Sequence, residues 1–211
     1  MRNSDGFTLV EFLVAMVISL IVMSSIYSVY RSQQKSYVAQ EQITVMQQNL
    51  RAGMTMITRD IRTAGYDPTR SLGTGIISAN SDQLQFTRVV ESGSTEVETI
   101  TYSYDSDALA LKRNDGGGNQ TVAENIEALD FVYLDSSGVT TASLPDIRSI
   151  QVTMVGRTGK GDQGYVNSDI YYNQMGDQVY PPPGSPAPND NIRRNSLTRE
   201  IKCRNLGIGG S

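Results

Sequence analysis

An apolar run that holds a single carboxylate occupies the start of this 211-residue chain. Between Phe7 and Ile26 the only ionisable side chain is Glu11. As a helix, a run of about 20 residues spans about 30 Å, which is the thickness of the hydrocarbon core of a bilayer. A carboxylate in such a segment is costly in lipid, so it indicates a function and a partner. The sequence therefore predicts a membrane-embedded helix over residues 7–26 that carries one ionisable group.

The junction before the run carries a second signal. Gly6 is followed by Phe7, and Glu11 is the fifth residue after the glycine. An ordinary signal peptide would explain the apolar run but not Glu11, and no small-x-small cleavage pattern with a polar flank follows a short apolar core. The pattern resembles the type III signal of type IV pilins and type II secretion pseudopilins. The resemblance implies that a prepilin peptidase cleaves between Gly6 and Phe7 and that Phe7 is then N-methylated.

The same resemblance implies where the protein resides. Residues 1–6 would be a leader peptide, and the chain would cross the bacterial inner membrane once, with its C-terminal domain in the periplasm. It would later join a pilus at the cell surface. Arg2 and Asp5 precede the run and Arg31 and Lys35 follow it, so the positive-inside rule alone does not set this orientation. The orientation therefore rests on the resemblance.

For Glu11 the resemblance implies a role in assembly. After cleavage the amine of Phe7 would be positively charged, and both charges would lie in an apolar filament core. Pairing Glu11 of one subunit with the amine of a neighbour removes two unpaired buried charges at once. The alternative is that Glu11 lies at interfacial depth and is merely solvated.

The helical pattern continues beyond the apolar run. From Tyr27 to Ala64 there is no proline and the only glycine is Gly53, while Gly65 and Pro68 supply a stop. Apolar residues recur at helical spacing along one stripe, namely Ile43, Met46, Leu50, Met54, Ile57, Ile61 and Ala64. This pattern predicts one helix over residues 7–64, of which the part from residue 27 onwards is amphipathic and packs against a domain.

Residues 66–211 are predicted to form that domain. Alternating runs predict strands at residues 84–90, 97–104, 108–112, 126–134, 147–155 and 196–204. Because no helical pattern separates these strands, an antiparallel sheet is expected to pack one face on the helix. The Tyr/Pro-rich stretch 159–192 is expected to be an inserted loop of extended polyproline character outside the sheet. The predicted class is α+β, a type IV pilin fold with a long N-terminal helix on an antiparallel β-sheet.

Composition excludes several chemistries. The chain has no histidine and one cysteine, which excludes a His/Cys zinc site, a Ser-His-Asp triad and an intramolecular disulfide. Cys203 is expected to be a small core residue, with an intermolecular bridge as the alternative. A net charge of −4 makes nucleic acid an unlikely partner. We therefore expect no enzymatic activity, no cofactor and no small-molecule substrate.

Two further groups of residues are weaker candidates for binding. Oxygen ligands for calcium could come from Asp105, Asp107 and Asp115, although aspartates are also ordinary turn residues. A partner-binding surface could come from Tyr165, Tyr171, Tyr172 and Tyr180. The alternative for these tyrosines is a structural role, in which they cover the edge of the sheet.

The residues at the end of the predicted helix indicate which subgroup of pilins the chain resembles. The segment 59–66 reads Arg-Asp-Ile-Arg-Thr-Ala-Gly-Tyr, which resembles PilW-type minor pilins first and J-type type II secretion pseudopilins next. This resemblance implies a minor pilin that takes part in type IV pilus assembly or priming. Its partners would be the prepilin peptidase, other major and minor pilins, and the inner membrane. The alternatives are a minor pseudopilin of type II secretion and a pilus-tip adhesin or DNA-uptake subunit.

Overall fold

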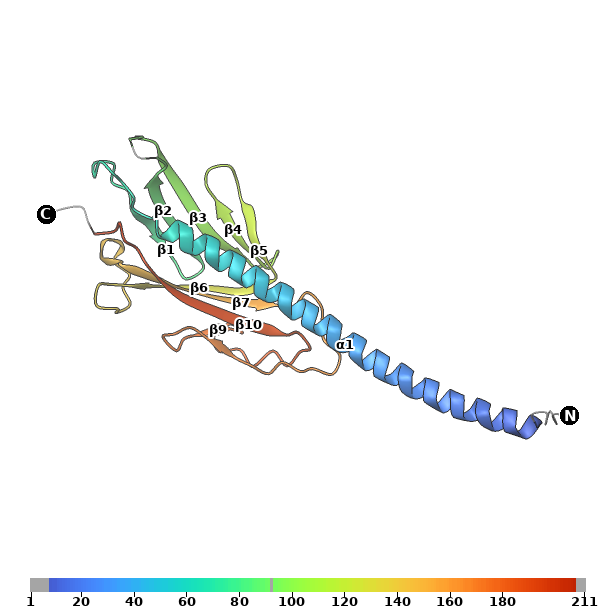
Figure 1. Ribbon diagram of the computed structural model, residues 1–211. Coiled ribbons are helices and arrows are strands. Elements are labelled where there is room, and N and C mark those ends of the chain that lie inside the picture. Colours follow the sequence, from blue (N-terminus) through green and yellow to red (C-terminus); the bar gives the residue numbers. More distant parts are fainter. Residues whose placement is uncertain (1–7, 92, 208–211) are drawn as a thin grey trace. The chain divides into compact units, whose positions relative to one another are not determined.

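The computed structural model describes residues 8–91 and 93–207, which form two compact units divided after Glu41. A single helix, α1 (Leu9–Ile61), runs through both units (Figure 1). In the first unit every side chain from Leu9 to Val38 is exposed. This is the one helix among the described residues whose length and composition would allow it to cross a membrane.

The helix ends slightly earlier than the sequence pattern predicts. Its last residue is Ile61, and the chain then tightens into turns in which the Ala64 N–H donates to the Ile61 carbonyl at 3.0 Å. Gly65 follows with φ of 74°, a conformation that suits glycine. The Asn205 amide donates to the carbonyls of Arg62 at 3.0 Å and Ala64 at 3.5 Å. The C-terminal segment thus satisfies carbonyls that the helix end leaves open.

The second unit contains three antiparallel sheets (Figure 1). A five-stranded meander follows chain order and consists of β1 (Ile76–Ala79), β2 (Gln83–Val89), β3 (Val97–Asp105), β4 (Ala110–Asn114) and β5 (Gln120–Glu124). A three-stranded sheet has the order β10 (Arg194–Lys202), β7 (Ser149–Arg157), β6 (Ile126–Leu134), with the short 3-10 helix η1 (Leu144–Asp146) before β7. The third sheet is a hairpin of β8 (Tyr171–Tyr172) and β9 (Gln178–Tyr180).

The core lies between the C-terminal part of α1 and the two larger sheets. The apolar stripe predicted from spacing is confirmed, because its residues from Met46 to Ala64 are all at most 4% exposed. Two glycines permit a close approach of the helix. A Cβ at Gly156 of β7 would lie 2.8 Å from Leu50 Cγ, and one at Gly53 would lie 3.1 Å from Ala123 Cβ. At these two points the backbone of the glycine therefore lies directly against a side chain of the opposing element.

The predicted fold class is confirmed, but the expectation of one antiparallel sheet is wrong. The sheet divides into a five-stranded and a three-stranded part, and β1 and β5 were missed because these short strands show no clear alternation of apolar residues. The expectation that residues 159–192 contain no sheet element is also wrong. There the side-chain oxygen of Asn173 accepts the N–H groups of Met175 and Asp177, both at 2.9 Å, and this turn closes the β8–β9 hairpin.

Candidate assembly site

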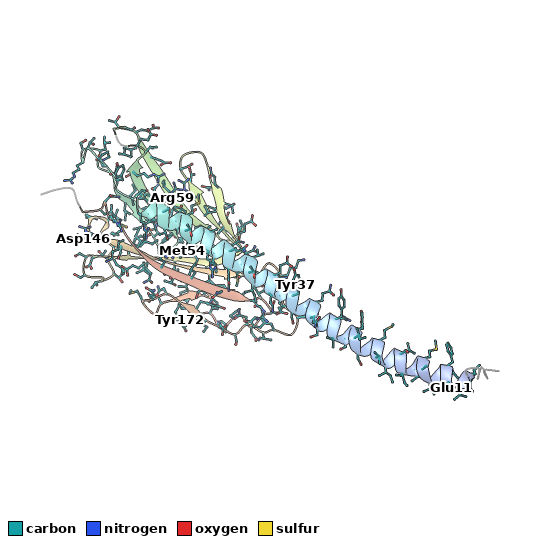
Figure 2. All side chains as sticks on the ribbon, in the orientation of Figure 1. Glu11, Tyr37, Met54, Arg59, Asp146 and Tyr172 are labelled. Atoms are coloured by element: carbon teal, nitrogen blue, oxygen red, sulfur yellow. The ribbon has the colours of Figure 1, made fainter. Side chains whose placement is uncertain are left out.

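Glu11 lies in the first turn of α1 (Figure 2). There it takes part in a capping box with Thr8. Its carboxylate accepts the Thr8 backbone N–H at 3.0 Å and the Thr8 hydroxyl at 2.9 Å. In return the Glu11 N–H donates to Thr8 Oγ1 at 3.3 Å. This reciprocal arrangement satisfies donors that a helix N-terminus leaves open. The Thr-x-x-Glu spacing carries this signal in the sequence, but the sequence reasoning missed it.

The surroundings of Glu11 are apolar and uncovered. Leu9, Val10 and Phe12 are 76%, 67% and 65% exposed, respectively. Such a surface needs cover from lipid or from other apolar helices. The two residues of the predicted cleavage junction, Gly6 and Phe7, lie outside the described residues.

At the other end of α1, a buried ion network holds the helix to the five-stranded sheet. Asp60 is only 6% exposed and accepts hydrogen bonds from Arg113 Nε at 2.7 Å and from the Tyr102 hydroxyl at 2.8 Å. Arg88 lies 3.6 Å from the same carboxylate. Burial, with the Asp60 charge as a second cause, raises the pKa of Tyr102 well above its usual range. Tyr102 therefore stays protonated and keeps donating.

A second layer surrounds this network. Arg88 Nε pairs with Glu98 at 2.8 Å, and its NH1 donates to Thr63 Oγ1 at 3.0 Å. Arg113 also forms an ion pair with Asp115, which holds the pKa of the Asp115 carboxyl below its usual range. Asp60 belongs to the segment that carries the resemblance to minor pilins. The structure shows that its carboxylate joins helix and sheet.

The three candidate calcium ligands do not converge. The carboxylate of Asp105 accepts the N–H groups of Asp107 and Ala108 in the β3–β4 turn. Asp115 follows the opposite end of β4 and is engaged by Arg113. Among the described residues, no group of three or more acidic, histidine or cysteine side chains could hold a metal ion. These aspartates therefore act in turns and an ion pair, and the calcium expectation is not supported.

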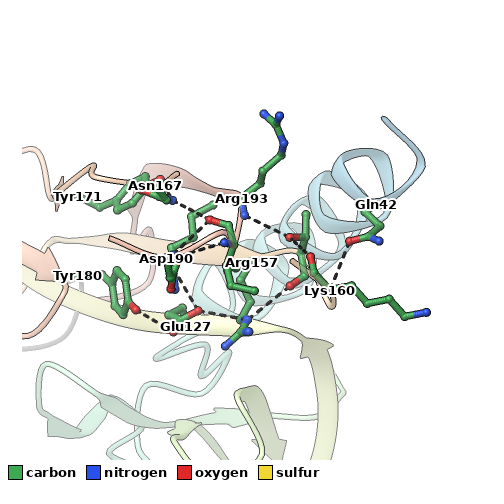
Figure 3. A network of polar contacts seen from close by, with 12 residues as sticks. Gln42, Glu127, Arg157, Lys160, Asn167, Tyr171, Tyr180, Asp190 and Arg193 are labelled. Atoms are coloured by element: carbon green, nitrogen blue, oxygen red, sulfur yellow. Dashed lines mark hydrogen bonds and ion pairs between the residues drawn. The ribbon is translucent and has the colours of Figure 1, made fainter. Parts of the chain in front are cut away.

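Residues 159–192 are fastened to the three-stranded sheet by a polar network (Figure 3). Glu127 of β6 accepts the Tyr180 hydroxyl at 2.9 Å and pairs with Arg157 at 3.4 Å and Arg194 at 3.3 Å. Asp190 receives both NH1 and NH2 of Arg194 at 2.7 Å, and hydrogen bonding to that arginine lowers the pKa of Asp190. The Arg194 side chain, 2% exposed, is thus enclosed by two carboxylates.

Three of the four candidate tyrosines belong to this network or its margin. Tyr180 lies 4.9 Å from the Arg194 guanidinium and 6.5 Å from the ring of Tyr171. Tyr165 lies 4.0 Å below the Arg193 guanidinium. Tyr172, in contrast, is 51% exposed. Tyr165, Tyr171 and Tyr180 are thus engaged in contacts within the domain, whereas Tyr172 is the most exposed of the four candidate tyrosines.

The β8–β9 hairpin is clamped to the outer side of the same sheet by amide side chains. Asn173 Nδ2 donates to Asp130 at 3.0 Å and to Asp177 at 3.3 Å. Gln151 and Gln174 exchange two further hydrogen bonds, at 2.9 and 3.1 Å. Burial raises the pKa of Asp130, and the nearby Asp177 charge acts in the same direction. At neutral pH the structure therefore holds a carboxylate that burial disfavours.

We expect Asp130→Asn to raise the free energy of unfolding at pH 7, since Asn can still accept from Asn173 but carries no charge. A carboxyl whose folded pKa is raised binds its proton more tightly when folded, so its contribution to stability falls as pH rises from about 3.8 through the folded pKa. The gain in the variant should therefore shrink as pH falls towards 3.8. Urea unfolding of both full chains at several pH values measures this, and a pH-independent difference would contradict it.

Cys203 lies in the apolar core, as expected. It is 4% exposed and is a free thiol, and burial raises its pKa to about 12. At neutral pH the thiol is protonated and unreactive.

Comparisons with known proteins agree with this geometry. Residues 1–27 match the family described as the prokaryotic N-terminal methylation motif, which implies processing by a prepilin peptidase. No curated protein matches the chain by sequence. Among solved structures, the chain is similar to a type IV-like pilin from Thermus thermophilus, with 18% identity, a TM-score of 0.51, and coverage of 75% of this chain and 95% of that one. The chain therefore has a type IV pilin-like fold and carries a prokaryotic N-terminal methylation motif.

Proposed function

We propose that this chain is a minor pilin that takes part in the assembly or priming of a type IV pilus. The observation that carries the proposal is the methylation motif followed by an exposed apolar helix with Glu11 in its first turn, on a pilin-like domain. The helix remains in the inner membrane after cleavage between Gly6 and Phe7. It then leaves the lipid for the filament, where neighbouring helices cover its apolar side chains.

In this assembly, Glu11 is proposed to set the axial offset between neighbouring subunits. The capping box engages one carboxylate oxygen, Oε2, with Thr8, and the other oxygen remains for an amine from a neighbouring subunit. In an apolar core, an ion pair between Glu11 and the Phe7 amine of a neighbour forms at one axial offset only. A subunit at another offset would leave two buried charges unpaired.

The test is the intact mass and N-terminal sequence of the chain from membranes with and without prepilin peptidase. We expect a mature chain that starts at Phe7 and is one methyl group heavier only where the peptidase is active. A chain that still starts at Met1 beside an active peptidase would contradict the proposal. Deleting the gene then separates the candidates, because loss of pili supports the minor pilin and loss of protein export supports the type II secretion pseudopilin.

A further inference from the structure

The solvent-facing side of α1 in the second unit carries an exposed row of arginines. Arg51, Thr55, Arg59 and Arg62 follow each other at spacings of four, four and three residues, and all four are exposed. At about 1.5 Å per residue, Arg51 and Arg62 lie roughly 16 Å apart along the helix axis. Exposed acidic side chains are absent from residues 42–64, since Asp60 is buried in the core network. Together with the exposed Met56, these residues form what we call the arginine face.

Nothing within the described chain neutralises the arginine face. Among the described residues, every ion pair involves cations other than Arg51, Arg59 and Arg62. The helix dipole favours cations in the last turn, which explains Arg59 and Arg62. It does not explain Arg51, because Arg51 lies almost three turns before the end of the helix. These three cations are therefore free to bind an anionic partner.

The β8–β9 hairpin offers the complementary surface. Two exposed carboxylates, Asp177 in its turn and Asp169 two residues before β8, have no ion pair among the described residues, whereas Asp162 and Asp190 of the same segment are paired with arginines. Between these two carboxylates lie three exposed apolar side chains, Ile170 at 36%, Tyr172 at 51% and Met175 at 46%. Tyrosine and methionine are enriched in interface cores. We refer to these five exposed residues as the hairpin tip.

The turn within the hairpin tip is fastened to the three-stranded sheet by hydrogen bonds. Asn173 is 7% exposed and Gln151 only 1%, and their hydrogen bonds to Asp130 and Gln174 fix both sides of the turn. A surface that is already ordered loses little conformational entropy on binding. Arg59 and Tyr172 lie on different sides of the domain, so a hairpin cannot reach the arginine face of its own chain (Figure 2). The two surfaces can meet only between molecules.

We propose that the hairpin tip of one copy docks on the arginine face of a second copy, with Asp169 and Asp177 facing the arginines and Met56 meeting the apolar side chains. Such a contact joins two different surfaces, so two copies meet head to tail and leave one hairpin tip and one arginine face free for neighbouring subunits. This inference rests on the proposed function, since the contact would join copies of the minor pilin within the pilus assembly.

The test uses two full-length, differently tagged copies expressed together with the assembly machinery. One copy carries Arg59→Cys and the other Asp177→Cys, and mild oxidation traps a mixed disulfide dimer if the two surfaces meet. The native Cys203 is buried and serves as the background in every sample. The matched control replaces Asp177→Cys with Asp107→Cys, which changes an exposed aspartate in the β3–β4 turn. Filament and membrane fractions are analysed separately, and the mature N-terminus is checked by mass.

We expect the mixed dimer from Arg59→Cys with Asp177→Cys and not from the control pair. Absence of the mixed dimer from both fractions would overturn the contact, as would an equal yield of dimer from the control pair. A dominant Arg59→Cys self-dimer would also overturn it, because it would mean a symmetric contact. The arginine face would then be left for another anion, such as a lipid headgroup. Filament incorporation without the mixed dimer rejects the contact alone. A chain that is not cleaved by the peptidase rejects the proposed function. In that case the presence or absence of the mixed dimer in the membrane fraction still tests the contact.

Charge reversal gives a second readout. Arg59→Glu should lower incorporation about tenfold, because like charges would face each other across the contact. Adding Asp177→Arg on the same chain should restore incorporation, since each contact between two such copies regains an opposite pair. Failure of the second change to restore it, with both variants folded and processed, would count against the contact.

Discussion

Glu11→Gln should be cleaved and methylated normally and yet be lost from filaments. Glutamine keeps a side-chain carbonyl that can accept the Thr8 N–H, so the capping box survives, but it cannot neutralise a buried amine. Leaving one partner of a buried ion pair alone costs about 3–5 kcal/mol, and 3 kcal/mol corresponds to roughly a 100-fold loss of incorporation. Comparing the variant in membrane and filament fractions with the wild type measures this effect.

The matched variant for this experiment is Glu11→Ala, which removes both the charge and the cap. If Glu11 acts in assembly through its charge, alanine and glutamine should be excluded from filaments to a similar degree. If capping were its only role, glutamine would behave like the wild type, and alanine would lose only about 1 kcal/mol of helix stability. Normal incorporation of Glu11→Gln would therefore refute the proposed pairing.

Asp60→Ala should cause the largest loss of stability of any single change in the ion network. Arg113, whose side chain is 9% exposed, would remain buried with only Asp115 to neutralise it, and the Tyr102 hydroxyl would lose its acceptor. Removing one partner of a buried pair in this way typically costs about 3–5 kcal/mol. Urea unfolding of the full chain in detergent, followed by near-UV circular dichroism of tyrosine, measures the change.

Two variants control this prediction. Asp60→Asn retains an acceptor for both donors and should lose less, about 1–3 kcal/mol. Asp107→Ala changes an exposed aspartate of the β3–β4 turn and should stay within about 0.5 kcal/mol of the wild type. If Asp60→Ala were as stable as Asp107→Ala, the network would not hold the helix to the sheet.

Local patterns accounted for the helix and most of the strands. The stripe from Met46 to Ala64 could be read from its spacing because a helix buries every third or fourth residue, and this period survives whatever the partner is. Strand β7 showed its alternation equally well, and the structure places it at the centre of the three-stranded sheet. The short strands β1, β5, β8 and β9 did not, since none of them carries a clear alternation of apolar and polar residues.

The side-chain networks could not be predicted in the same way. Asp60 and Arg113 are 53 positions apart, and Tyr180 and Glu127 are also 53 positions apart. No sequence rule connects such pairs, because they meet only after the sheets have packed on the helix. The candidate tyrosines illustrate the consequence. The sequence offered no way to rank the four tyrosines as candidates for binding. Packing around Arg193 and Arg194 left only Tyr172 of the four largely exposed.

By itself the sequence determined the apolar helix, the position of Glu11 within it, the methylation motif and the pilin-like class, because each depends on residues that are neighbours along the chain or one helical turn apart. Only the tertiary structure decided how the sheet divides, which charges are buried and paired, and which remain free on the arginine face and the hairpin tip. These features depend on which surfaces face each other after folding, because a charge is paired only where packing brings an opposite charge beside it.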